Sequence, residues 1–224
     1  WNIRAGGGKR IEHIAAQLAA WGADVVALSE FRATPASLWL QEALAEQGLG
    51  HQVTTADPAR HALNRLLVAS RWPTEPLALP TSPRPRELWL PVAIRAPEPF
   101  AIGALHIPTF SFAGKHKYAF HRALLRIAKR WTGGPALMAG DTNTGHSGID
   151  EESPVFGKQS DAWMTGMEAA GWRDAFRALH GDERAYTWYS PNAGNGFRLD
   201  EAFVNPELMP RLTEARYAWA KSPD

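Results

Sequence analysis

The chain has 224 residues, which is enough for one large domain or two small ones with a sizeable core. Its 24 Lys and Arg nearly balance its 23 Asp and Glu, and the net charge of +1 neither demands nor excludes a polyanionic partner. The lack of cysteine excludes disulfides and thiolate metal sites, and no apolar run approaches the roughly 20 residues that span a bilayer. No signal peptide is visible, and we expect a cytoplasmic, monomeric protein with no membrane partner.

Helix and strand patterns follow one another irregularly along the chain. Apolar residues at helical spacing predict helices at residues 9–21, 36–47, 115–131 and 160–170. Short apolar runs predict strands at residues 24–30, 51–56, 65–70, 87–95, 100–107, 135–140, 198–204 and 213–220. The mixture of βα units and directly linked strand pairs indicates a mixed sheet system with helices outside. Because no repeat or low-complexity linker divides the chain, we expect one domain over residues 1–224.

Polar side chains stand at the ends of several of these strands. They are Glu30 in "VVALSE", His106 in "IGALH", Asp141 and Asn143 in "MAGDTNTG", and Asp200 in "GFRLDEAFV". Side chains two apart in an extended segment share a face, so Asp141 and Asn143 can reach one shared atom.

Each of these residues alone has an ordinary structural explanation. An acid at a strand end usually caps a turn or helix, and a lone histidine usually makes its hydrogen bonds within the fold. Asp200 can pair with Arg198. Together they offer oxygen ligands for a hard divalent cation, a carboxylate for a water and an amide for an oxyanion. The set therefore predicts metal-assisted hydrolysis of a phosphate ester.

Two basic segments accompany the strand-end residues. "RAGGGKR" at Arg4–Arg10 lacks the spacing and the Ser or Thr of a P-loop, so we interpret it as a flexible loop near the mouth of the site. The helix at residues 115–131 is strongly basic, and we interpret its charges as a solvated face whose start can contact substrate phosphates. Its charged residues are Lys115, Lys117, Arg122, Arg126, Lys129 and Arg130.

Six segments in order resemble motifs of the endonuclease/exonuclease/phosphatase superfamily. They are "WNI" at residues 1–3, "DVVALSEF" at 24–31, "LLVASRWP" at 66–73, "ALHIPT" at 104–109, "MAGDTNTG" at 138–145 and "YTWYSPNAGNGFRLDEAFV" at 186–204. Thr142 stands where the family has an aromatic residue, and Glu201 replaces a tyrosine. Each segment is a weak signal, whereas six in the right order are specific.

The resemblance implies a four-layer α-β-β-α sandwich, with two mixed β-sheets face to face and helices outside. It implies that Asn2 and Glu30 hold Mg²⁺ or Mn²⁺. Asp141 would orient or deprotonate the attacking water, and Asn143 would hold the phosphate. His106 would contact the phosphate and the leaving group, while Asp200 would orient a catalytic histidine. The same motifs suggest substrate contacts for Arg71, Tyr186, Trp188 and Arg198.

The end of the chain departs from the family pattern. The family closes with a Ser-Asp-His motif, whereas this chain ends "WAKSPD" and begins at Trp1 rather than Met, so we expect both ends to be trimmed. Asp224 is either the aspartate of that motif or part of a loop before it, and Pro223 favours the loop.

Three functions stay open at this point. The first, which we favour, is a nuclease that cleaves DNA phosphodiesters as an endonuclease or exonuclease. The second is a phosphatase or phosphodiesterase for small-molecule or lipid head-group phosphates. His106 matches the deoxyribonuclease I and sphingomyelinase branches, whereas "YTWYS" and "GFRLD" match the exonuclease III branch. The third is an inactive binding module, if the closing motif is absent.

Overall fold

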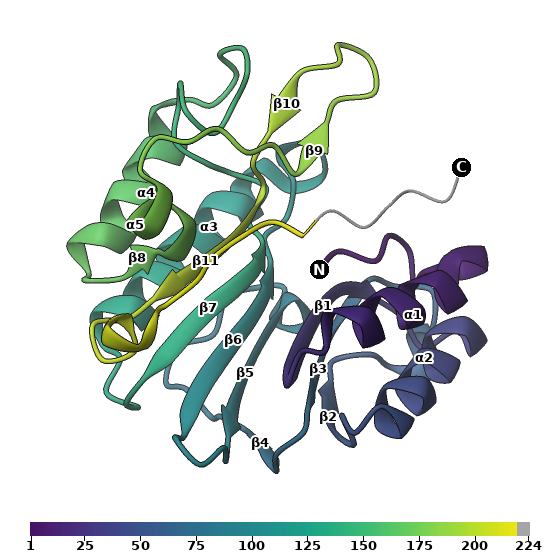
Figure 1. Ribbon diagram of the computed structural model, residues 1–224. Coiled ribbons are helices and arrows are strands. Elements are labelled where there is room, and N and C mark those ends of the chain that lie inside the picture. The colour runs from purple at the N-terminus through teal and green to yellow at the C-terminus, as the bar shows by residue number, and fades with distance from the viewer. Residues whose placement is uncertain (219–224) are drawn as a thin grey trace.

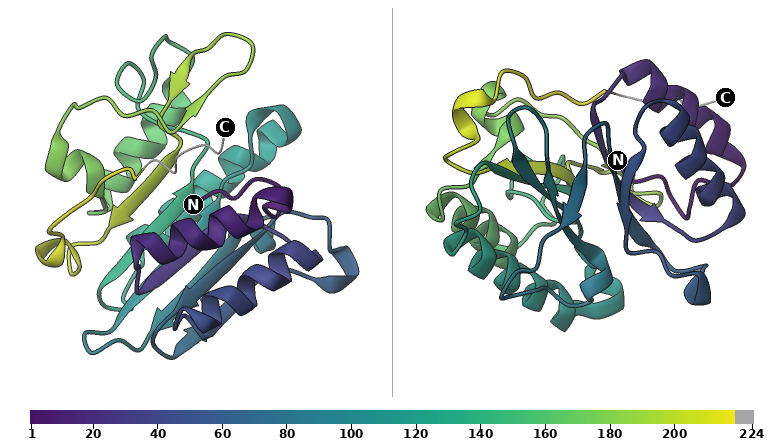
Figure 2. Two further views of the ribbon diagram at one scale, coloured as in Figure 1. Left: turned by 45° about the vertical axis from the view of Figure 1, so that its right-hand side comes forward. Right: turned by 90° about the horizontal axis from the view of Figure 1, so that it is seen from below.

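Two β-sheets lie face to face in the middle of the molecule, as Figures 1 and 2 show. The structure is a computed structural model that describes residues 1–218, apart from the side chains of residues 110–115. In one sheet the strands run antiparallel in the order β1-β3-β2, with bounds β1 Val25–Phe31, β2 His51–Thr54 and β3 Arg65–Ser70.

The second sheet has six strands in the order β4-β5-β6-β7-β11-β8. Their bounds are β4 Thr74–Pro76, β5 Trp89–Ile94, β6 Phe100–His106, β7 Ala136–Asp141, β8 Arg173–Asp174 and β11 Asp200–Val204. β6 and β7 pair in parallel, and the other neighbours pair antiparallel. A separate hairpin, β9 Trp188–Tyr189 and β10 Gly196–Phe197, stands above the end of β11 (Figure 1).

Helices cover the outer face of each sheet. The first sheet is covered by α1 Ile11–Trp21 and α2 Pro35–Glu46. The second is covered by α3 Phe110–Lys129 and α4 Lys158–Ala169, with the short α5 Ala175–His180 beside β8 and β11. Short 3₁₀ turns occupy Gly8–Arg10, Pro58–Arg60, Arg86–Leu88 and Met209–Arg211. This arrangement confirms the predicted four-layer sandwich, with the difference that only the second sheet is mixed, whereas β1, β3 and β2 pair antiparallel.

Three apolar layers hold the sandwich together. Between the sheets, Leu66 and Val68 of β3 pack with Val92 of β5 and Ile102 of β6. The other two layers lie between each sheet and its helices. Every residue of β3 is buried, because one face meets the other sheet and the opposite face meets the helices.

Local signals account for several boundaries. α1 ends where Gly22 takes a left-handed conformation at φ 60°, and its N–H bonds to Leu18 and Ala19 carbonyls close the last turn. The strand predicted at residues 213–220 is wrong over the described part, since residues 213–218 form no strand. The segment instead contacts β11 through a side chain, since the Tyr217 hydroxyl donates to the Asp200 carbonyl at 2.7 Å.

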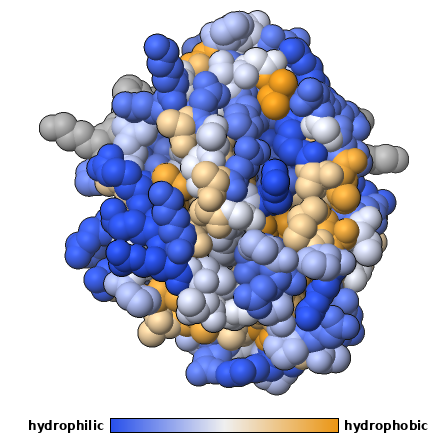
Figure 3. Space-filling view, turned by 90° about the vertical axis from the view of Figure 1, so that its left-hand side faces the viewer, coloured by the Kyte–Doolittle hydropathy of each residue, from blue (hydrophilic) through white to orange (hydrophobic). Residues whose placement is uncertain are grey.

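One face of the molecule is mostly hydrophilic. On the side of α4 and α5, Figure 3 shows hydrophilic side chains over most of the area, with small apolar groups between them. Within residues 1–218, none of the helices has both the length and the apolar character that crossing a membrane requires.

Candidate active site

Strand register places three of the predicted residues in one row. His106 of β6 is the partner of Asp141 of β7, and Asp141 is the partner of Asp200 of β11. Directly paired residues on neighbouring strands project to the same face, about 4.8 Å apart per strand. An imidazole and two carboxylates therefore line up across one end of the second sheet.

Close packing at Gly140 makes this register possible. Gly140 has φ 148°, and a Cβ added there would lie 2.0 Å from the carbonyl oxygen of Leu105. Only glycine fits such a close approach of two backbones. The glycine before Asp141 thus sets how the end of β7 lies against β6.

Asn2 joins the two sheets at this row. Its backbone forms an isolated parallel bridge with Ser29 of β1. Its amide nitrogen donates to Glu30 Oε1 at 3.1 Å and to Asp141 Oδ2 at 3.0 Å. Its amide oxygen accepts from the Arg4 N–H at 2.9 Å, which fixes the orientation of the amide. One side chain therefore connects a carboxylate of each sheet, and the site lies where the two sheets meet.

Glu30 takes an unusual backbone conformation to reach this point. Its φ is 56°, and the β1–β3 register shifts between Ser29 and Phe31, so Glu30 is the bulged residue. Its Oε2 accepts from the Ala5 N–H at 2.7 Å, and its carbonyl accepts from the Gly6 N–H at 2.8 Å. Left-handed non-glycine residues cost roughly 1–3 kcal/mol and concentrate at functional sites. The glycine-rich loop lies against Glu30, which agrees with its predicted place near the site.

The Asp141 carboxylate is buried and surrounded by donors. Its Oδ1 accepts from the Asn143 N–H at 3.1 Å, and His106 Nε2 lies 3.8 Å from Oδ2. Burial raises the pKa of Asp141 to about 6; His106 opposes this rise, and the nearby Asp200 adds to it. Among the described residues, the buried Nδ1 of His106 has no hydrogen-bond partner.

Asn143 is held at three points. Besides its N–H bond to Asp141, its side-chain amide donates to the Ile107 carbonyl at 2.8 Å. Lys117 Nζ donates to the Asn143 carbonyl at 2.5 Å. Asn143 has φ 48°, so these contacts hold a residue in a sparsely populated conformation.

Lys117 is a site residue that the sequence interpretation missed. It is 7% exposed, and burial lowers its pKa to about 8, against the opposing effect of Asp141 and Glu201. The expectation of a fully solvated basic face is wrong at this position. One sequence signal could have indicated Lys117: it lies in the first half of the basic helix α3, which directly follows the strand that ends at His106.

The donor set suits a hard divalent cation in its chemistry. Glu30 and Asp141 bring carboxylate oxygens together without sulfur, whereas the Asn2 amide turns its nitrogen toward them and its oxygen toward the Arg4 N–H. Within residues 1–218, His, Cys, Asp and Glu do not form a group of three or more around one metal position. Mg²⁺ needs fewer protein ligands, since it is usually bound by one or two carboxylates together with water and phosphate oxygens. The residues present therefore fit Mg²⁺ or Mn²⁺ better than a metal that needs a full protein cage.

Arg198 does not lie where a substrate contact requires it. Its side chain is fully buried, so the substrate role predicted for it is wrong. Its guanidinium donates to Asp150 at 2.6 and 3.0 Å and to Asp174 at 2.6 Å, and it lies 3.2 Å from Glu201. Arg177 also pairs with Asp150.

Burial raises the pKa of Glu201, against the opposing effect of Arg198. Arg177 and Arg198 thus lie among the carboxyl groups of Asp150, Asp174 and Glu201, and this cluster ties the loop after β7 to β11. The tyrosine that the family carries at Glu201 is thus replaced by a carboxyl group inside this cluster.

Arg71 lies at the wrong end of its sheet for the contact predicted. It follows Ser70, which pairs with Val25 at the start of β1, whereas Glu30 lies near the other end. Five residues of strand separate these ends by about 17 Å. Arg71 instead pairs with Asp24 at 2.8 Å on the surface. The antiparallel register of β1 and β3 is the reason.

Tyr186 and Trp188 flank the site without being buried. Both are half-exposed, on or beside the β9–β10 hairpin. Thr187 between them accepts from the Leu199 and Asp200 N–H groups at 3.0 and 3.3 Å. The aromatic pair is therefore anchored next to the Asp141–Asp200 row, and its substrate contact stays a prediction. Asp224 lies outside the described residues.

Comparison with known proteins identifies a family. A sequence model described as the Endonuclease/Exonuclease/phosphatase family matches residues 1–220. An exodeoxyribonuclease from Streptococcus pneumoniae is 30% identical over 113 residues, covering 44% of this chain and 39% of that protein. One from Bacillus subtilis is 32% identical over 94 residues, covering 36% and 37%. The matched regions thus span well under half the length of these relatives.

Solved structures share the fold. An AP endonuclease from Archaeoglobus fulgidus has a TM-score of 0.73 at 19% identity, covering 92% of this chain and 83% of that one. The 3′ phosphatase NExo from Neisseria, bound to a product DNA hairpin, has a TM-score of 0.71 at 18% identity, covering 90% and 84%. At these identities the likeness is one of architecture.

Proposed function

The chain belongs to the endonuclease/exonuclease/phosphatase family, and on this premise we propose that it is a divalent-cation-dependent phosphodiesterase that hydrolyses DNA with an activated water. The observation that carries the proposal is the bridge that Asn2 makes between Glu30 and Asp141, beside the row of His106, Asp141 and Asp200.

The residues divide the chemistry between them. Asp141 is the group that orients the water and accepts its proton, because its carboxylate sits in the middle of the row and is fixed by two donors. Asn143 uses one amide hydrogen on the Ile107 carbonyl, which leaves the second for a phosphate oxygen. His106 lies beside Asp141 and donates to the phosphate or leaving-group oxygen. Asp200 would orient a catalytic histidine.

Glu30, with Asn2 beside it, would hold Mg²⁺ or Mn²⁺. When bound, this cation supplies positive charge that neutralises the phosphate. The carboxylate of Glu30 is oriented for this by the Ala5 N–H and the Asn2 amide.

DNA is the preferred substrate for two reasons. The bacterial relatives are named exodeoxyribonucleases. The half-exposed Tyr186 and Trp188 stand beside the row of acidic residues, and aromatic faces stack on bases at roughly 1–3 kcal/mol per base. A phosphatase for small-molecule or lipid head-group phosphates is the second candidate, and the experiment below separates the two.

The test is a substrate panel on purified protein with Mg²⁺, Mn²⁺ or EDTA. The panel contains supercoiled plasmid, abasic duplex, single strand, a 3′-phosphorylated duplex and bis-p-nitrophenyl phosphate. Cleavage of DNA that requires the cation supports the proposal. Turnover of the small ester with all DNA left intact would favour the second candidate, and no turnover of any substrate would favour a binding module.

Asp141→Asn is the decisive variant. We expect it to lower kcat by about 10²–10⁴-fold, the range for a general acid–base group. Asp24→Asn is the matched control, because Asp24 is an acid at the opposite end of the sheet. Equal activity of Asp141→Asn and wild type would show that the carboxylate has no part in the chemical step.

A further inference from the structure

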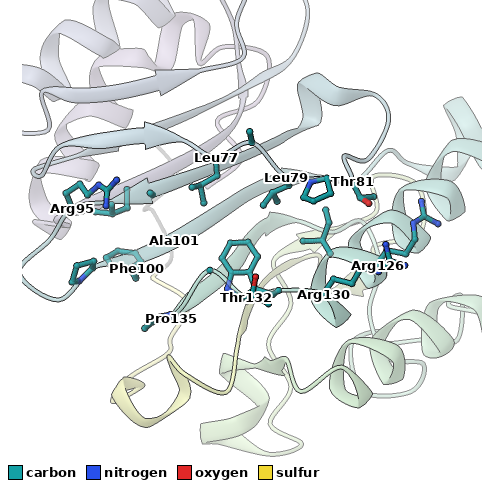
Figure 4. Close-up of a pocket in the computed structure, with 18 residues that line it drawn as sticks. Leu77, Leu79, Thr81, Arg95, Phe100, Ala101, Arg126, Arg130, Thr132 and Pro135 are labelled. Carbon is teal, nitrogen blue, oxygen red and sulfur yellow. The ribbon is translucent and has the colours of Figure 1, made fainter.

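A cavity of about 420 Å³ opens at the end of the second sheet opposite to Asp141. Figure 4 shows it between the segment that carries Leu77 and Leu79 and the end of α3. β6 runs from Phe100 at this cavity to His106 at the candidate active site, roughly 20 Å away. The cavity is therefore separate from the catalytic row.

The lining of this cavity is mostly apolar and firmly held. Its apolar side chains include Leu77, Leu79, Phe100, Ile127, Trp131 and Pro135. The Trp131 indole donates to the Gly134 carbonyl at 2.8 Å, and its ring meets Trp172 edge-on at 5.9 Å. These contacts fix the Trp131 wall, so the cavity is already formed. Its volume falls in the range of about 300–1,000 Å³ that small-molecule sites occupy.

Two guanidinium groups stand at the rim of the cavity. Arg126 and Arg130 both line the cavity and are exposed. They lie four residues apart on α3, so they share a helix face, where like charges repel. No carboxylate of residues 1–218 forms an ion pair with either one. Glu75 pairs with Arg95 instead, and Glu98 pairs with Arg211.

We propose that this cavity binds a small amphipathic anion, with its apolar body against Trp131 and Phe100 and its carboxylate or phosphate between Arg126 and Arg130. An anion at the rim relieves the repulsion between the two arginines and gains charge-assisted hydrogen bonds. The apolar body removes the exposed lining from water. A ligand with only one of these parts satisfies half of the site, so charge and apolar body are both required.

The test measures binding of octanoate by calorimetry, with acetate, octanamide and octylammonium as comparison probes. Octanoate supplies both parts, acetate lacks the body, and the other two lack the negative charge. We expect octanoate to bind saturably and each comparison probe to bind at least about tenfold more weakly. Octanamide and octylammonium lose the charge-assisted hydrogen bonds, and acetate loses the buried apolar body. The Trp131 indole N–H signal, assigned from its loss in Trp131→Phe, should shift as octanoate is added.

Charge variants locate the anion. Arg126→Gln with Arg130→Gln should weaken octanoate binding about tenfold or more. Arg122→Gln with Lys129→Gln is the matched control, because this pair also removes two positive charges from exposed positions of α3, and neither residue lines the cavity. It should leave the affinity unchanged. Equal binding of octanoate and octanamide, an unmoved Trp131 signal, or equal losses in the two kinds of variant would overturn the proposal. Binding does not depend on hydrolysis, so the result is independent of the proposed function.

Discussion

Replacing His121 with Phe should make the protein less sensitive to acid. The His121 ring is 3% exposed, stacks on Trp163 of α4 at 4.7 Å, and has no hydrogen-bond partner at either nitrogen among the described residues. Burial, with a smaller contribution from the charges of Lys117 and Arg122, lowers its pKa to about 3. Tyr118 meets the ring edge-on at 6.0 Å. His121 is therefore neutral in the folded protein at pH 5, whereas it is charged when the chain unfolds.

The direction of the effect follows from proton binding. The unfolded state binds the proton near pH 6.5 and the folded state only near pH 3, so acid favours unfolding. Stability from this group is complete above pH 6.5 and is lost as the pH falls from there toward 3. pH 5 lies about 1.5 units below the pKa of about 6.5 in the unfolded chain. At about 1.36 kcal/mol per unit, the free energy of unfolding is therefore lower by about 2 kcal/mol at pH 5. Phe keeps the stacking on Trp163 and removes the proton site.

Urea unfolding of wild type and His121→Phe at pH 7.5 and pH 5 measures this difference. The free energy of unfolding should fall by about 2 kcal/mol less in the variant than in wild type. His116→Gln is the control, because His116 is exposed on the same helix. If His121→Phe loses as much stability between the two pH values as wild type does, the buried neutral histidine is not the cause.

Three further substitutions test the site and its support. Lys117→Met removes the bond to the Asn143 carbonyl and should lower kcat about tenfold with little change in KM, if the proposed function holds; a loss of stability with unchanged kcat would contradict this positioning role. Arg198→Met leaves buried carboxylates unpaired and should cost roughly 3–5 kcal/mol in urea unfolding at pH 7.5; a cost below about 1 kcal/mol would mean that the cluster is not held by charge. Gly140→Ala puts a Cβ against the Leu105 carbonyl and should cost roughly 3 kcal/mol, and a crystal structure of the variant should show β7 displaced from β6; wild-type stability would refute the close approach.

The sequence by itself determined the layers and the identity of most residues in the site. Apolar spacing predicted α1 and its end at Gly22, because a helix face is set by residues three and four apart. The apolar run at residues 66–69 predicted a strand, and β3 confirms it. Polar residues at strand ends pointed to Glu30, His106 and Asp141, since a polar side chain where an apolar run stops needs a reason of its own.

Only the tertiary structure decided which charged side chains meet solvent and which end of a sheet they occupy. Arg71 follows a strand just as Glu30 ends one, yet antiparallel pairing sends them to opposite ends of the sheet. Arg198 is indistinguishable in sequence from a surface arginine, and its burial depends on carboxylates 24 and 48 residues away. Lys117 belongs to a basic helix but turns inward, toward a carbonyl 26 residues away. Local periodicity reports the face of one element, whereas pairing, register and charge neutralisation depend on groups that are brought together only when the whole chain folds.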